Sequence, residues 1–167
     1  MTSLILYASQ SGNTQTLAKA LYDSIEGEKE IYPIDQAPSH DLDYDLVAVG
    51  FWLQAGKPDP RTEAFLKECK MDAKVFLFAT HGAAKGSDHA RAAMDYAMSL
   101  LNGAEVVGTY SCQGEVNPKV LEKMKQKDTP PPWIGDAAYA VGHPDDSDIA
   151  ELKAVLKKSV SNRIQGR

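Results

Sequence analysis

The stretch that decides the fold is Ser3-Leu4-Ile5-Leu6-Tyr7-Ala8, followed at once by Ser9-Gln10-Ser11-Gly12-Asn13-Thr14. Residues 4–8 form an almost unbroken apolar run, as is typical of a strand that is covered on both faces. Residues 14–26 place Leu or Ile at every fourth position, which is the spacing of one helix face. The sequence therefore predicts a buried strand, a tight polar loop and a helix N-terminus in direct succession.

The polar loop suits an anionic ligand such as a phosphate. Its donors are three hydroxyls, two side-chain amides and the backbone N–H groups around one glycine, supplied by Ser9, Ser11, Thr14, Gln10, Asn13 and Gly12. A helix N-terminus adds unpaired N–H groups and about half a positive charge. The loop contains no Lys or Arg, so a phosphate bound there would be held by hydrogen bonds and dipoles.

Several kinds of phosphate site are excluded by what the loop lacks. A nucleoside-triphosphate loop needs a Lys after its second glycine, and a dinucleotide fingerprint needs three glycines, whereas Gly12 stands alone. A cysteine-based phosphatase loop is excluded because the first cysteine is Cys69, and a phospho-acceptor receiver domain because residues 4–14 contain no acid. The alternative that stays open is a polar turn that merely caps a helix.

Length and composition limit the class of protein. The 167 residues are enough for one domain with a substantial core, and we expect residues 1–167 to form it. A net charge of −5 argues against nucleic acid as a partner and suits docking onto basic protein surfaces. The chain has no apolar run of membrane-spanning length and no signal peptide, so we expect a cytoplasmic monomer or weak dimer that inserts into no membrane. Two cysteines, and four histidines without ligand spacing, predict neither a disulfide framework nor a metal site.

Strand-like and helix-like segments alternate along the chain. The predicted strands are residues 4–8, 30–34, 45–51, 74–80 and 105–111, and the predicted helix starts after the first are at Asp59, Ser87, Asn117 and Ser147. This alternation predicts an α/β fold, an open parallel five-stranded sheet with helices on both faces. Ligands of such sheets bind at the carboxyl ends of the strands, where we expect four loops to meet: 9–14, 51–59, 80–87 and 112–116.

Two of these loops have features of a site for a flat aromatic ligand. Phe51-Trp52 follows the third strand directly, and a bulky aromatic there can stack on a planar ring. Thr80-His81-Gly82 follows the fourth strand, and its backbone could pair with the polar edge of such a ring. Taken alone, Trp52 could equally be a core or rim aromatic, and His81 a plain loop histidine.

The pattern Ser/Thr-x-Ser/Thr-Gly-Asn-Thr after a first strand resembles the flavin mononucleotide (FMN) phosphate loop of flavodoxins. With the other two loops in register, the resemblance covers about residues 1–111. It implies strand order 2-1-3-4-5, one non-covalent FMN and one-electron transfer between redox partner proteins. Carried over, the cofactor-binding residues are Ser9, Gln10, Ser11, Gly12, Asn13 and Thr14 for the phosphate, Phe51, Trp52, Leu53 and Gln54 in the first ring loop, and Thr80, His81 and Gly82 in the second.

The chain departs from the flavodoxin pattern in two places. Residues 80–87 contain no aromatic, although the second ring loop of flavodoxins commonly supplies one. An extra segment of about residues 113–146, the insert, separates the fifth strand from the last helix. The insert could fold over the flavin, form a partner surface or pack against the sheet edge, and we expect the last. An open flavin face would instead suit an FMN-dependent reductase acting on a quinone, tetrapyrrole or other planar substrate. A flavin-free binding module is the third alternative.

Overall fold

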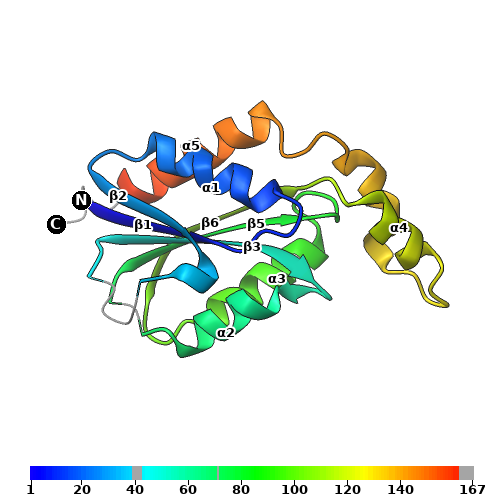
Figure 1. Cartoon of the computed structure of the whole chain (residues 1–167), viewed down its shortest axis with the longest axis horizontal. Helices are drawn as coiled ribbons and strands as arrows, with labels where there is room; N and C mark the ends of the chain where they lie inside the picture. The colour runs from blue at the N-terminus through cyan, green and yellow to red at the C-terminus, as the bar shows by residue number, and fades with distance from the viewer. Residues whose placement is uncertain (39–42, 71, 162–167) are drawn as a thin grey trace.

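A computed structural model describes residues 1–38, 43–70 and 72–161, which form a parallel sheet between two layers of helices (Figure 1). The long strands are β1 (Thr2–Tyr7), β2 (Glu28–Pro33), β3 (Leu46–Gln54), β5 (Lys74–His81) and β6 (Glu105–Gln113). They are hydrogen-bonded in the order β2-β1-β3-β5-β6, and every neighbouring pair is parallel. The short β4 (Lys57–Pro58) pairs antiparallel with the end of β3. Apart from β4, which the sequence pattern did not indicate, the predicted order is confirmed.

Helices cover both faces of this sheet, as predicted. The helices α1 (Asn13–Ser24) and α5 (Asp146–Ser161) lie on one face, and α2 (Pro60–Glu68) and α3 (Asp88–Ser99) on the other (Figure 1). A 3-10 turn, η1 (Ile34–Gln36), follows β2. No helix within the described residues is long and apolar enough to cross a membrane.

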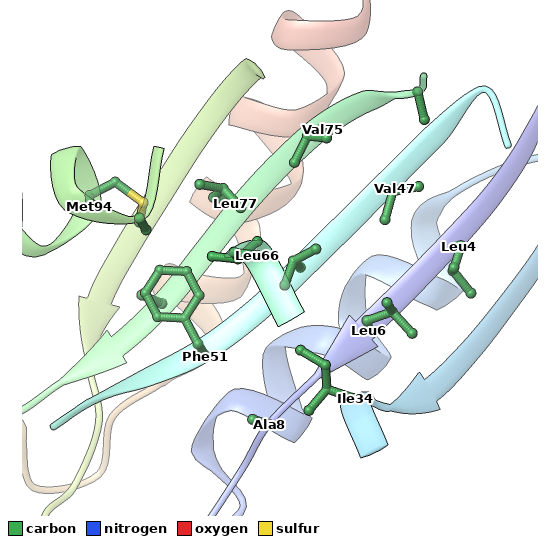
Figure 2. Packing of buried hydrophobic residues seen from close by; sticks show 14 residues of the cluster. Leu4, Leu6, Ala8, Ile34, Val47, Phe51, Leu66, Val75, Leu77 and Met94 are labelled. Carbon is green, nitrogen blue, oxygen red and sulfur yellow. The ribbon is translucent and has the colours of Figure 1, made fainter. Parts of the chain in front are cut away.

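The core consists of two apolar clusters, one on each face. Figure 2 shows the cluster under α2 and α3, where Leu66 and Met94 lie over Leu77 of β5 and Phe51 of β3. The other cluster joins α1 and α5 to the opposite face of the strands. The four central residues of β1 and the first six of β3 are buried, because both faces of these strands are covered.

The helix starts follow the predicted caps with one exception. Asp59, Ser87 and Asn117 each accept backbone N–H groups of the helix that follows, which confirms them as N-caps. Ser147 was predicted to cap α5, and this is wrong because α5 begins at Asp146. Asp145 and Asp148 bond each other's backbone N–H at 3.0 Å. This reciprocal pair satisfies two N–H groups, whereas a Ser147 cap would satisfy one.

The insert does not lie along the sheet edge as expected. It contains α4 (Pro118–Lys125) and the 3-10 segment η2 (Pro132–Ala140), which pack on each other. Both lie beyond the carboxyl ends of the strands (Figure 1), the end of the sheet where the loops meet. The position follows from the backbone at the start of the insert, where Gly114 donates its N–H to the His81 carbonyl at 2.9 Å.

Candidate functional site

The polar loop at residues 9–14 leaves the N-terminus of α1 open. Gly12 stands at the cap position with φ +93° and makes no side-chain cap hydrogen bond. The other α-helices within the described residues are all capped by side chains, three by the predicted residues and α5 by Asp145. The first turn of α1 thus presents its N–H groups and the positive end of its dipole to a ligand. This is the geometry of an anion site.

Most polar side chains of the loop already have partners within the protein. Ser9 Oγ accepts the Gly12 N–H at 3.1 Å and so shapes the turn. Asn13 Nδ2 donates to the Glu115 carbonyl at 3.0 Å, which ties the loop to the insert. The Thr14 and Thr80 hydroxyls, 2.9 Å apart and buried, join the loop to the end of β5. The Thr14 hydroxyl is thus engaged with Thr80, while its backbone N–H lies in the first turn of α1.

A cavity of about 290 Å³ opens beside this loop, at the carboxyl ends of the central strands. The strand order reverses between β1 and β3, so the cavity lies where open α/β sheets bind ligands. Nine of the predicted site residues line it: Gln10, Ser11, Asn13, Trp52, Leu53, Gln54, Thr80, His81 and Gly82. Its exposed lining is more apolar than polar, as a planar ring requires.

The first ring loop is a tight hairpin that holds Trp52 in place. Ala55 and Gly56 both have positive φ, 52° and 75°, and Gln54 and Lys57 pair across them. Positive φ at both central residues is the signature of a two-residue type I′ turn. The Asp59 N–H donates to the Trp52 carbonyl at 2.9 Å and closes the loop. Ala55 lacks the usual Asn or Asp of such turns, which is why the sequence pattern missed β4.

His81, at the end of β5, has a neutral side chain with a hydrogen-bond partner at each ring nitrogen. Only 6% of its surface is exposed, and this burial lowers its pKa to about 4. Its Nδ1 lies 3.0 Å from the Ala83 carbonyl, which can only accept, so Nδ1 carries the proton. Its Nε2, 3.2 Å from Ser111 Oγ, accepts from that hydroxyl. His81 therefore has no spare proton to donate into the cavity at neutral pH.

The insert supplies an apolar wall of the same cavity. Val116, Val120, Met124 and Trp133 all line it. A Cβ on Gly82 would lie 2.8 Å from Val116 Cγ2 and 2.9 Å from Trp133 Cζ3, so only glycine lets the insert approach this close. Trp133, far along the chain, thus places an aromatic side chain beside Gly82 in the cavity wall. The sequence pattern missed these residues because the insert was expected at the sheet edge.

The remaining predicted residues lie outside the main cavity. Ser9 and Gly12 line a second hollow on the other side of the loop, together with Arg61 of α2. Arg61 is a cation beside the loop that a search for Lys or Arg within residues 9–14 could not find. Thr14 is buried against Thr80, and Phe51 is fully buried in the core (Figure 2). The structure therefore brings nine of the thirteen predicted residues together around the cavity.

One cluster of titratable groups lies apart from the cavity. His143, Asp145 and Asp148 place their ligand atoms within 4.8 Å of one another. Asp148 accepts the Asp145 N–H, lies 2.5 Å from His143 Nδ1 and 3.8 Å from Lys85 Nζ. These contacts assign the cluster to the cap of α5.

Known proteins share this fold. A family model described as "Flavodoxin domain" matches residues 4–157. The chain is 27% identical to the flavodoxin-like domain-containing protein BilS of Clostridioides difficile (strain CD3), over 94% of this chain and 95% of that protein. A flavodoxin of Streptococcus pneumonia TIGR4 has a TM-score of 0.63 at 14% identity, over 97% of this chain and 99% of its own. A flavoprotein of Lactobacillus acidophilus NCFM, solved in complex with FMN, has a TM-score of 0.56 at 20% identity, over 66% and 92%.

Proposed function

The chain belongs to the flavodoxin domain family, and on that premise we propose that it binds one FMN non-covalently and carries single electrons between redox partner proteins. One observation carries the proposal. The uncapped N-terminus of α1 opens beside the apolar cavity lined by Trp52. An anion site next to a cavity for a planar ring matches the two ends of FMN.

The residues present fit both ends of the cofactor. The phosphate would lie at the N-terminus of α1, held by backbone N–H groups and by Ser11, whose side chain makes no protein hydrogen bond within the described residues. The isoalloxazine ring would lie between Trp52 and the apolar side chains of the insert. When bound, FMN supplies the redox chemistry, and the protein orients it and sets its electrostatic surroundings.

A carrier needs no acid, base or nucleophile of its own, and neither His81 nor the Thr14–Thr80 pair is placed to act as one. His81 is neutral, and both of its ring nitrogens are engaged. Thr80 and Thr14 use their hydroxyls on each other. These groups position the loops around a ligand and transfer no proton to it.

A second candidate function is an FMN-dependent reductase for a quinone, tetrapyrrole or other planar substrate. It is favoured by the apolar wall of the insert, where Val120 and Met124 could hold a flat substrate beside the ring. The two functions predict different kinetics. A reductase turns over rapidly with a reduced nicotinamide and a small acceptor, whereas a carrier exchanges electrons with proteins.

Reconstitution tests the proposal. The purified chain, stripped of ligand, is titrated with FMN while flavin fluorescence is followed. We expect saturation at one FMN per chain, followed by reduction with dithionite and rapid reoxidation by an oxidised cytochrome. A chain that ignores FMN but binds FAD or ATP would overturn the proposal. Fast steady-state oxidation of NADPH with a small quinone would favour the reductase.

A further inference from the structure

We propose that the insert carries a docking surface for an electron-transfer protein whose contact face is acidic around an apolar centre. The inference rests on the proposed function and deepens it by stating the chemistry of the partner. It runs against the net charge of −5, which by itself predicts basic partners.

The insert leaves apolar side chains exposed. Within the described residues, four large hydrophobic side chains are exposed, and three of them lie on the insert: Val120 at 38%, Tyr139 at 76% and Val141 at 65%. No residue of α4 is buried, although its apolar and charged residues lie on different sides of the helix. Such exposed apolar surface on one projecting segment is typical of an interaction site.

The first half of the insert is locally basic, although residues 113–146 as a whole carry four Lys and six acidic residues. Residues 117–133 carry four Lys and two acidic residues, whereas the other 150 residues carry 14 basic and 21 acidic ones. Lys125 lies 3.6 Å from Glu122, and no ion pair of Lys119, Lys123 or Lys127 is found within the described residues. These three lysines are exposed and available to an acidic partner.

The lysines border the apolar row that forms the cavity wall. Lys123 follows Val120 by three residues, and positions three apart are neighbours on a helix surface. Val120 itself lines the cavity and is also exposed, so it links the outer surface to the proposed ring site. A partner bound on α4 would therefore meet the wall of the redox site, as electron transfer requires.

A protein fits this surface better than a lipid bilayer. The α4 helix carries three Lys and one Glu, fewer cations than the clusters of about four to eight that bind anionic lipids. The acidic remainder of the chain would also be repelled by an anionic membrane. A second copy of this chain could offer its acidic body to the insert, and this is one of the outcomes tested.

The test uses the FMN-loaded, dithionite-reduced protein and two probes, cytochrome b5, which is acidic, and cytochrome c, which is basic. Stopped-flow oxidation is measured from about 0.01 M to about 0.15 M ionic strength, where the screening length falls from ~30 Å to ~8 Å. We expect the rate with cytochrome b5 to fall about tenfold as salt rises, because steering is lost. The net charge of −5 alone predicts the opposite, a rate that rises with salt, because salt screens the repulsion between two acidic proteins.

Matched charge reversals place the effect on the insert. Lys119→Glu with Lys123→Glu should slow cytochrome b5 reduction about tenfold at low salt and reverse its salt dependence. Lys157→Glu with Lys158→Glu, on the exposed side of α5, changes the net charge equally and should alter the rate by less than about twofold. FMN titration of each variant shows that the redox site itself is intact.

Five results would overturn the inference. A rate with cytochrome b5 that rises with salt, or equal loss in both double variants, places docking elsewhere. Binding to phosphatidylserine vesicles that is lost only in the Lys119/Lys123 variant makes the surface a membrane contact. Self-association lost in the same variant, seen by sedimentation velocity, makes it a dimer contact. Failure to bind FMN at all overturns the proposed function as well, and the titration separates that result from the others.

Discussion

The two walls of the cavity are built in different ways. On one side, the polar loop and Trp52 extend from strands whose neighbouring residues are wholly buried, and main-chain hydrogen bonds hold each turn. On the other side, α4 buries none of its residues and packs mainly on η2. One wall takes its position from the core of the sheet. The other wall is held by a few contacts, so we expect changes to it to alter specificity and partner binding more than folding.

The largest expected effect concerns the wall built on the sheet. Riboflavin, which lacks the phosphate, should bind at least a hundredfold more weakly than FMN. The reason is that hydrogen bonds to a charged group are worth about 1.5–3 kcal/mol each. Ser11→Ala should weaken FMN and leave riboflavin almost unchanged. The Thr14 hydroxyl contacts Thr80 and not the phosphate, so Thr14→Ala should weaken the binding of FMN and of riboflavin to the same extent. Fluorescence titrations of both ligands measure this, and equal affinities for the wild type would exclude a phosphate site at α1.

His81 lies between the two walls of the cavity, and its lowered pKa predicts that the stability of the fold depends on pH. Burial lowers its pKa to about 4 from 6.5, so between these values the unfolded chain binds a proton that the folded chain does not. The contribution of His81 should therefore raise the free energy of unfolding by about 3 kcal/mol between pH 4 and pH 6.5. Above pH 6.5 this contribution should stay constant. Urea unfolding of wild type and His81→Gln at several pH values measures the difference. An unchanged slope in His81→Gln would contradict the assignment.

The same contrast explains what the sequence could predict. The buried strands and three helix caps were predictable because hydrophobic period and cap chemistry are local signals, whereas the strand order followed from the resemblance to flavodoxins. The hairpin at Ala55 was missed because its turn lacks Asn or Asp. The start of α5 depends on a reciprocal Asp145–Asp148 pair, which competes with Ser147 for the same role. Trp133 and Met124 reach the cavity only through tertiary packing, for which the sequence carries no periodic signal.

The next test compares the two tryptophans, one on each wall. Trp52→Ala and Trp133→Ala should each weaken FMN by about 1 kcal/mol or more, through lost stacking and burial. Both tryptophans line the ring site and not the phosphate loop, so each substitution should weaken riboflavin binding as much as FMN binding. In single-tryptophan proteins, Trp52→Phe and Trp133→Phe, the remaining indole should be strongly quenched by bound FMN. If Trp133 is not quenched, the insert does not face the ring.

The smallest expected effect tests how firmly the insert is seated. A Cβ on Gly82 would lie 2.8 Å from Val116 Cγ2 and 2.9 Å from Trp133 Cζ3, so these side chains would have to move away from the cavity wall. Gly82→Ala should therefore lower the free energy of unfolding by about 1 kcal/mol and weaken FMN binding by a similar free energy. Gly135→Ala is the matched control on the same insert, because nothing lies within 4 Å of its Cβ position, and it should change stability by less than about 0.5 kcal/mol.

A double-mutant cycle shows whether the loss comes from the insert. Val116→Ala removes the closest atom, so adding it to Gly82→Ala should recover much of what Gly82→Ala lost, giving a coupling of about 0.5–1 kcal/mol. Chemical denaturation of the two single variants and the double variant measures this coupling. Strict additivity would mean that Gly82 does not meet the insert in solution. The second wall would then be open, and a planar substrate rather than a protein would have free access to the ring.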